Sequence, residues 1–194
     1  MSANTIEVNQ SRQSLSDYEE IWLFGYGSLI YKVDFPYLEK APAYILGWSR
    51  RFWQGSHDHR GTPDQPGRVV TLIKDLGARC DGMAYRVTAE EFDHLDYREK
   101  NGYLRHEVPM TLLQQSGCEI KKRGLIYIAD EHNEAFLGEA SERQIAKQIA
   151  MSRGPSGENS EYLLKLDSAL TQLGAHDPHV STIKAHLTEI LDPK

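Results

Sequence analysis

The sequence predicts an α+β fold, in which a small mixed or mostly antiparallel sheet curls toward a barrel and helices flank it. Three observations lead to this prediction. Strand-like segments dominate the chain as far as residue 129, a single helix interrupts them, and three helices close the chain. Strands and helices therefore do not alternate regularly, as they would in a doubly wound parallel sheet.

Runs rich in aliphatic and aromatic residues mark the strands. The expected strands are 21–26, 43–53, 68–73, 80–87, 103–113 and 123–129. Residues 54–67 (QGSHDHRGTPDQPG) are dense in glycine, proline, serine and aspartate, which predicts a long loop between two strands. A turn around Gly77 is expected to separate the next two.

Capping residues and apolar spacing mark the helices. Thr88 and Glu91 fit the Ser/Thr-x-x-Glu capping box, which predicts a helix that runs to about residue 100. The signals for the later helices are a second capping box at Ser141 and Gln144, a stripe formed by Leu163, Leu166, Leu170 and Leu173, and a cap with a first-turn proline at Asp177-Pro178.

Length and composition indicate a folded protein with one domain over residues 20–194, preceded by a flexible N-terminal leader over 1–19. A short helix within the leader and a separate domain for the helical C-terminal third remain open. The net charge of -6 argues against general nucleic-acid binding. Residues 1–20 lack the apolar core of a secretory signal, and no run is long enough to span a membrane, so we expect a cytoplasmic location.

The segment FGYGSLI at 24–30 follows a buried strand and resembles no phosphate loop. Ile30 occupies the third glycine position of G-x-G-x-x-G, and Tyr26 and Ile30 flank Ser28 where a nucleophile elbow needs glycines. Glycines in such a turn allow backbone N–H groups to converge on a carboxylate or an oxyanion. The alternative is a tight turn that only packs beneath Tyr26.

Glu99 lies four residues after Leu95 and seven after Phe92, so the helical period places its carboxylate on an apolar stripe. Burial there would raise its pKa and suit a general base that works near neutral pH. Alternatively, the helix end frays and Glu99 pairs with a neighbouring cation (Arg98, Lys100 or Arg105). Asp93 and Asp96 are interpreted as solvated or capping groups.

Basic and aromatic residues interleave in WSRRFWQGSHDHRG at 48–61, which favours a small anionic ligand in so acidic a chain. Arg50 and Arg51 point to opposite faces of a strand, so at most one lines a given site. His57 and His59 have too few neighbouring ligands for a metal site. Cys80 and Cys118 lack metal or redox spacing.

Five segments together resemble the ChaC-type γ-glutamylcyclotransferases, the branch that degrades glutathione. They are FGYGSLI at 24–30, RRFWQGSHDHRGTP at 50–63, PGRVVTL at 66–72, LDYREKNGY at 95–103 and GPSGENSEYL at 154–163. The resemblance implies the γ-glutamylcyclotransferase fold. It departs from the family pattern at Asn101, where glycine is usual, and at Tyr31, where tryptophan is common.

The resemblance further implies cleavage of glutathione to 5-oxo-L-proline and L-cysteinylglycine, with no cofactor or metal and with no nucleic-acid or membrane partner. It places the general acid/base at Glu99. The implied substrate-binding residues are Gly25, Tyr26, Gly27, Ser28, Leu29 and Ile30. Arg51 and Tyr103 are weaker candidates for substrate contacts.

Three alternatives remain at this stage: a cyclotransferase for other γ-glutamyl amino acids or amines, a noncatalytic regulatory binding protein, and a nucleic-acid module that uses 48–61. The sequence leaves the oligomeric state open.

Overall fold

The computed structural model describes residues 4–192 and forms two compact units. The first, here the barrel unit, comprises Met1–Ser49 and Leu72–Glu134; the second, the helical unit, comprises Arg50–Thr71 and Ala135–Lys194. The strands β2 (Glu39–Ser56) and β3 (Gly67–Val87) contribute residues to both units. One domain over 20–194 stays a prediction.

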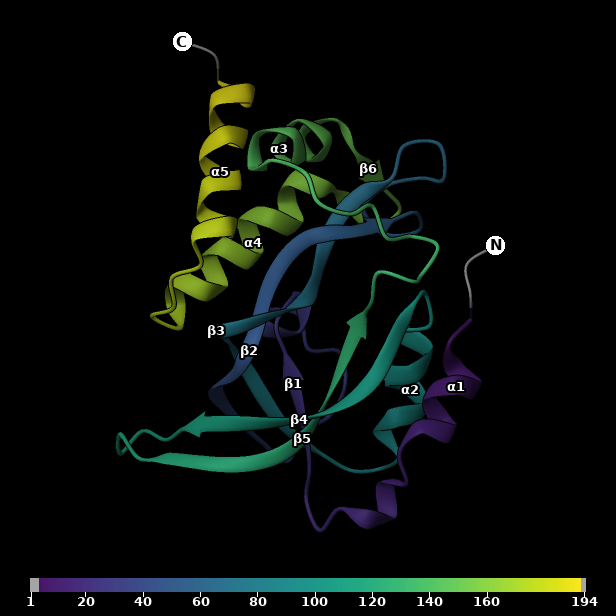
Figure 1. The fold of residues 1–194 in the computed structure, drawn as a ribbon, viewed down its shortest axis with the longest axis vertical. Helices are drawn as coiled ribbons and strands as arrows, with labels where there is room; N and C mark the ends of the chain where they lie inside the picture. Colours follow the sequence, from purple (N-terminus) through teal and green to yellow (C-terminus); the bar gives the residue numbers. More distant parts are fainter. Residues whose placement is uncertain (1–3, 193–194) are drawn as a thin grey trace. The chain divides into compact units, whose positions relative to one another are not determined.

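Five strands close a barrel in the order β1-β3-β2-β4-β5 (Figure 1). The elements of the barrel unit, besides its parts of β2 and β3, are α1 (Ile6–Arg12), η1 (Leu15–Asp17), β1 (Ile21–Gly25), η2 (Ser28–Ile30), α2 (Glu91–Arg98), β4 (Tyr103–Leu113) and β5 (Glu119–Ala129). Most strand pairs are antiparallel, and β1 lies parallel to β5 through Leu23 and Leu125. The predicted α+β barrel-like sheet is therefore confirmed.

The strand β1 is buried along its whole length because β3 pairs with one edge and β5 with the other. Such a strand shows a continuous apolar run instead of alternation. Its Leu23 packs in the core of the barrel unit with Phe92 and Leu95 of α2 and with Tyr85 and Tyr127 of the sheet. The sheet and α2 therefore share the core from which residues 25–30 and Glu99 emerge.

The expected turn at Gly77 is wrong, because β3 continues through this residue. Gly77 has a φ of 88°, a left-handed conformation that an extended strand accommodates as a local irregularity. The expected capping box at Thr88 is also wrong. The helix α2 begins later, its N-cap is Glu90 without a side-chain cap, and Thr88 accepts the Glu91 N–H through its backbone carbonyl.

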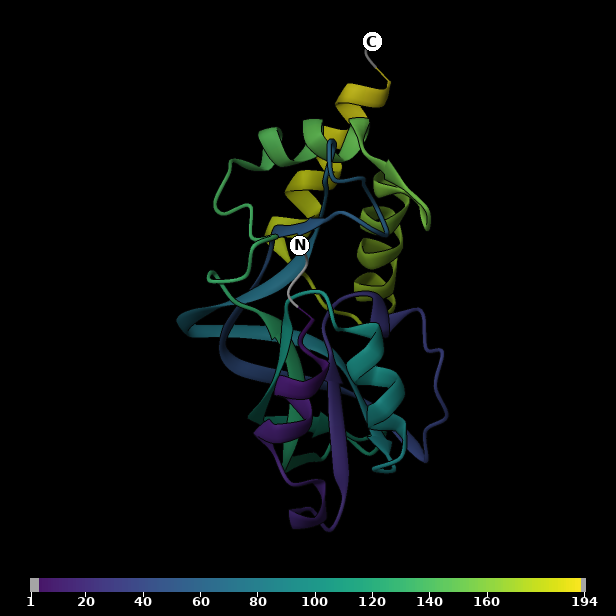
Figure 2. The same ribbon diagram turned by 90° about the vertical axis from the view of Figure 1, so that its right-hand side faces the viewer.

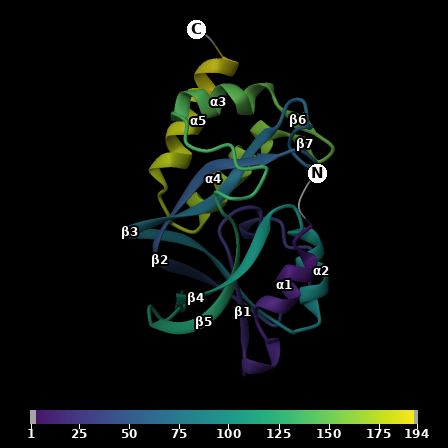
Figure 3. The same cartoon turned by 45° about the vertical axis from the view of Figure 1, so that its right-hand side comes forward.

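Part of the expected leader is helical, the alternative that the sequence left open. Residues 1–3 lie outside the described part of the chain, and α1 follows with Asn9 buried on its inner side. Figure 3 shows α1 beside α2. The helix α1 therefore packs against α2 and β4 of the barrel unit.

Three helices build the helical unit: α3 (Glu142–Met151), α4 (Asn159–Gln172) and α5 (Pro178–Leu191). Figure 2 shows α3 in green beside α5 in yellow. The unit also holds the two-residue strands β6 (Arg153–Gly154) and β7 (Gly157–Glu158). The predicted caps are confirmed, because Ser141 and Gln144 form a capping box and Asp177 accepts two N–H groups of α5.

Candidate active site

The loop at 25–30 leaves β1 and is fixed at three points. The Tyr26 hydroxyl donates to the Tyr127 carbonyl at 2.7 Å, and the Tyr85 hydroxyl donates to the Leu29 carbonyl at 2.6 Å. The third contact is a hydrogen bond of 3.0 Å that Arg98 donates to the Ser28 hydroxyl. The loop is thus connected to both the sheet and α2.

The first glycine of this loop is required because there is no room for a side chain, not because its backbone angles are unusual. A Cβ atom on Gly25 would lie 2.6 Å from the Cβ of Leu29, which is closer than real Cβ contacts. Neither Gly25 nor Gly27 has a positive φ. The glycine therefore lets the chain return tightly over the end of β1.

The loop exposes only some of its residues. Tyr26 and Leu29 are buried, whereas Gly27, Ser28 and Ile30 are partly exposed. The N–H of Ile30 donates to the Gly27 carbonyl at 3.0 Å and is used within the turn. Any ligand contact from Tyr26 must therefore come from its backbone, since its side chain belongs to the core.

Glu99 is the C-terminal cap of α2, and its N–H donates to the Leu95 carbonyl at 2.9 Å. Phe92 and Leu95 of the predicted apolar stripe are buried, and the Glu99 side chain is 17% exposed. Desolvation by burial raises the pKa of the Glu99 carboxyl above its ordinary value, and the nearby Arg98 opposes this effect. Both interpretations from the sequence hold in part, because Glu99 is mostly buried and also paired.

Arg98 joins the carboxylate to the loop. Its Nε lies 3.3 Å from Glu99 Oε1, while its Nη2 donates to Ser28. It also pairs with Asp34, whose charge raises the pKa of Glu99. The sequence interpretation named Arg98 only as a possible partner of Glu99. Its bond to Ser28 depends on a contact between residues 70 positions apart, for which the sequence holds no signal.

The interpretation of Asp96 as a solvated or capping group is wrong. This side chain is buried, accepts a hydrogen bond of 2.5 Å from the Tyr127 hydroxyl, and lies 3.4 Å from Nη1 of the buried Arg105. Buried carboxylates require such partners. Asp93 is exposed, as expected.

The two weaker candidates lie in different units. Tyr103 belongs to the barrel unit, begins β4 and donates its N–H to the Glu99 carbonyl at 3.3 Å. Arg51 belongs to the helical unit, is half-buried and donates to the Arg50 carbonyl. Within that unit Arg50 is buried and pairs with Asp177 at 2.6 Å. The substrate roles of Arg51 and Tyr103 stay predictions.

Residues 4–192 hold neither a cluster of metal-ligating side chains nor a helix suited to span a membrane. No group of three or more His, Cys, Asp or Glu side chains is placed there to hold a metal ion. In the same part of the chain, no helix has the length and apolarity needed to cross a membrane.

A family profile described as "ChaC-like protein" matches residues 21–190. The chain belongs to the ChaC-like family. The match spans the loop at 25–30, Arg98 and Glu99, and it excludes α1.

Similar proteins of known name agree with this assignment. Gamma-glutamylcyclotransferase 2-3 of Arabidopsis thaliana is 44% identical over 88% of this chain and 90% of its own length. Human glutathione-specific gamma-glutamylcyclotransferase 1 is 41% identical over 86% of this chain and 78% of its own length. A crystal structure of a yeast γ-glutamyl cyclotransferase specific to glutathione superposes with a TM-score of 0.80, at 33% identity, over 89% of this chain and 97% of that one. The ChaC-like chain therefore has the γ-glutamylcyclotransferase fold.

Proposed function

We propose that this protein cleaves glutathione to 5-oxo-L-proline and L-cysteinylglycine, with Glu99 as the general acid/base. One observation carries the proposal. A mostly buried carboxylate with a raised pKa is joined through Arg98 to the glycine loop that the family resemblance assigns to the γ-glutamyl group. The names of the relatives support glutathione as the substrate.

The reaction requires no nucleophile from the protein. The α-amine of the glutamyl residue attacks its own γ-carbonyl carbon, a C–N bond closes the five-membered ring, and the bond to the cysteinyl nitrogen breaks. Intramolecular attack is efficient when the reacting groups are held close and aligned. The loop, fixed through Tyr26, Ser28 and Leu29, suits this task.

Two proton transfers accompany the ring closure. The substrate amine is largely protonated at neutral pH, so a base must remove a proton before or during attack. Glu99 accepts that proton and returns one to the departing cysteinyl nitrogen. The α-amine loses a second proton as it becomes the lactam N–H, and the released amine of cysteinylglycine takes up one proton, so the proton count balances. The raised pKa of Glu99 favours the second transfer, and its pairing with Arg98 retains the charged form that the first one needs.

Backbone N–H groups of residues 26–29 are proposed to bind the substrate carboxylate or the γ-carbonyl oxygen. Donors directed at a developing oxyanion give large rate effects. Binding through the backbone agrees with the buried side chains of Tyr26 and Leu29.

The test is Glu99→Gln, which keeps the shape of the side chain and removes the base. We expect it to fold, to bind glutathione in calorimetry, and to lose at least about a thousand-fold in the rate of 5-oxoproline formation. Turnover at the rate of the parent protein would show that Glu99 is not the general acid/base.

Parallel assays with γ-glutamylalanine and a γ-glutamylamine test the substrate class. We expect glutathione to be preferred. Turnover of the shorter substrates alone would instead support the cyclotransferase alternative for other γ-glutamyl compounds.

A further inference from the structure

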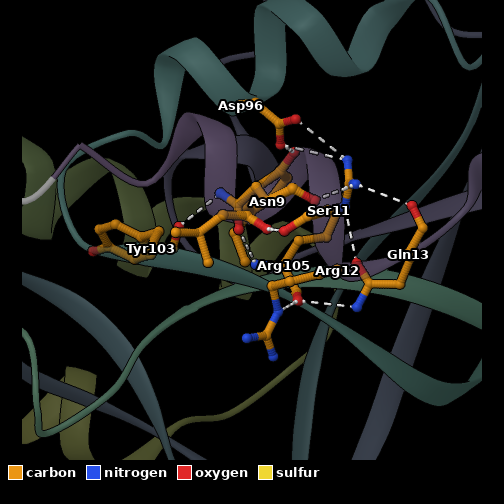
Figure 4. A network of polar contacts seen from close by, with 9 residues as sticks. Asn9, Ser11, Arg12, Gln13, Asp96, Tyr103 and Arg105 are labelled. Atoms are coloured by element: carbon orange, nitrogen blue, oxygen red, sulfur yellow. Dashed lines mark hydrogen bonds and ion pairs between the residues drawn. The ribbon is translucent and has the colours of Figure 1, made fainter.

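The helix α1 lies outside the segment 21–190 that the family profile matches, yet it contacts the backbone beside Glu99. Asn9 is the centre of this contact and is completely buried. Its side-chain amide donates to the Tyr103 carbonyl at 3.0 Å and accepts the Arg105 N–H at 2.7 Å (Figure 4). One amide therefore binds two backbone groups of β4, as a neighbouring strand would.

Arg105 of β4 in turn binds the N-terminal segment and also connects it with α2. Its Nη2 donates to the Asn9 carbonyl at 2.6 Å, and its Nε donates to Gln13 Oε1 at 3.0 Å. Its Nη1 faces Asp96 of α2 at 3.4 Å, as Figure 4 shows. Because a buried charge is stable only with such partners, Arg105 keeps α1, α2 and β4 in one arrangement.

Thr5 forms hydrogen bonds with the backbone of Glu99 and of the residue that follows it. Its N–H donates to the Lys100 carbonyl at 3.0 Å, and its hydroxyl donates to the Glu99 carbonyl at 3.4 Å. Thr5 is buried, so these bonds are shielded from water. The residues immediately after α2 are therefore held from the N-terminal side of the chain.

Glu99 needs support from outside its own helix. It caps α2 with φ of -94° and ψ of 11°, and the last residues of a helix fray when nothing holds them. The Tyr103 N–H also donates to the Glu99 carbonyl. Just beyond this bond, the side chain of Asn9 binds the Tyr103 carbonyl and the Arg105 N–H of β4. The chain from 99 to 105 is thus bound on one side by α1.

We infer that the N-terminal segment, through Asn9 and Thr5, positions Glu99 for proton transfer. These are positioning residues, since they act through the backbone of Glu99 and Tyr103. The inference rests on the proposed function. It assigns a contribution to residues that precede the matched family segment.

The test compares Asn9→Ala and Thr5→Val with Ser11→Ala, each made in the 194-residue chain. Ser11 is an exposed residue of the same helix, and its hydroxyl donates to the Val8 carbonyl of that helix, so its variant is the matched control. We expect Asn9→Ala to lower kcat for glutathione at least ten-fold with KM changed less than about three-fold. Thr5→Val should lower kcat two- to five-fold, and Ser11→Ala should match the parent.

The pH profile of kcat separates positioning from a loss of folded protein. Loss of these contacts releases the backbone at Glu99, so we expect its carboxyl to move toward solvent, to lose part of the desolvation that raises its pKa, and to shift the acid limb to lower pH. The charged or titratable groups that face Glu99 (Arg98, Asp34 and Tyr127) stay unchanged in these variants. An enzyme that is merely less stable would show a lower kcat at every pH with the acid limb at the same pH. That result would overturn the inference.

The variants also distinguish a failure of the positioning role from a failure of the proposed function. If Asn9→Ala does not fold by circular dichroism, Thr5→Val decides: a parental kcat and pH profile would overturn the inference, and a lower kcat with a shifted limb would support it. If Glu99→Gln is inactive while both N-terminal variants behave as the parent, the positioning role fails and the proposed function stands. If Glu99→Gln turns over normally, the proposed function itself fails.

Discussion

The guanidinium of Arg98 lies 3.0 Å from the hydroxyl of Ser28 on one side and 3.3 Å from the carboxylate of Glu99 on the other. A single cation therefore connects the glycine loop with the proposed general base. Such bonds to a charged group contribute more than neutral ones, and they also favour the ionised carboxylate. Five predictions test this arrangement and the loop beside it.

Arg98→Met should raise the pKa of Glu99, because Arg98 lowers it in the parent protein. A base must be deprotonated to act, so the acid limb of kcat/KM should move to higher pH. At neutral pH we expect kcat/KM to fall about ten-fold or more, since a hydrogen bond to a charged group is lost as well. Rates of 5-oxoproline formation between pH 5 and 9 measure both effects.

Asp34→Asn is the complementary variant. The Asp34 charge raises the pKa of Glu99, so its removal should lower that pKa and move the acid limb to lower pH. Shifts in the same direction for Arg98→Met and Asp34→Asn would contradict this electrostatic interpretation.

Ser28→Ala should retain turnover. Ser28 accepts one bond from Arg98, and its loss leaves the pairs of Arg98 with Asp34 and Glu99 in place. We expect kcat/KM to fall about three- to ten-fold. A loss of about 10⁴-fold or more, as follows removal of a serine nucleophile, would instead indicate a covalent mechanism.

Gly25→Ala should displace the loop, because the new Cβ would meet Leu29 Cβ at 2.6 Å. Overpacking of this kind costs about 1–3 kcal/mol of stability, and we expect kcat/KM for glutathione to fall at least about ten-fold.

Gly77→Ala is the control for this variant. Its φ of 88° makes alanine unfavourable by about 1 kcal/mol, yet an added Cβ meets nothing within 4 Å. We expect its activity to stay near that of the parent. Equal losses of activity in the two variants would show that stability, not loop geometry, limits the rate.

Tyr26→Phe should destabilise the barrel unit by about 1 kcal/mol, the typical net value of one hydrogen bond. The lost bond is the one that the Tyr26 hydroxyl donates to the Tyr127 carbonyl. Urea unfolding followed by circular dichroism measures the change, and Tyr44→Phe, which removes a hydroxyl from an exposed contact with Glu119, is the control. A stability equal to that of the parent would mean that the loop does not depend on this anchor.

The sequence predicts local features of this protein well. The range 103–113 agrees with β4, and the caps of α3 and α5 are confirmed, because strand composition and capping depend on neighbouring residues. Gly77 shows where the local signal fails. A glycine with positive φ is common in turns, but an extended strand also tolerates it, and only pairing with other strands decides between the two.

In the candidate site, too, features that depend on neighbouring residues could be predicted and those that depend on distant residues could not. The burial of Glu99 follows from its spacing to Phe92 and Leu95, which one helix determines. The burial of Asp96 depends on Arg105 of β4, which lies beyond the helix, and Asn9 is a single polar residue in a polar segment. Neither has an apolar pattern that would reveal it before the chain is folded.

Tyr127 of β5 contacts both the glycine loop and the helix α2. Its carbonyl accepts a hydrogen bond from the hydroxyl of Tyr26, and its own hydroxyl donates to Asp96 of α2, the helix that ends at the proposed general base. One residue of the sheet thus sets the spacing between the loop and the helix before any ligand arrives. Under the proposed function, glutathione then meets groups that are already ordered, so less conformational entropy is lost on binding and more of the interaction energy is available for bending the substrate toward ring closure.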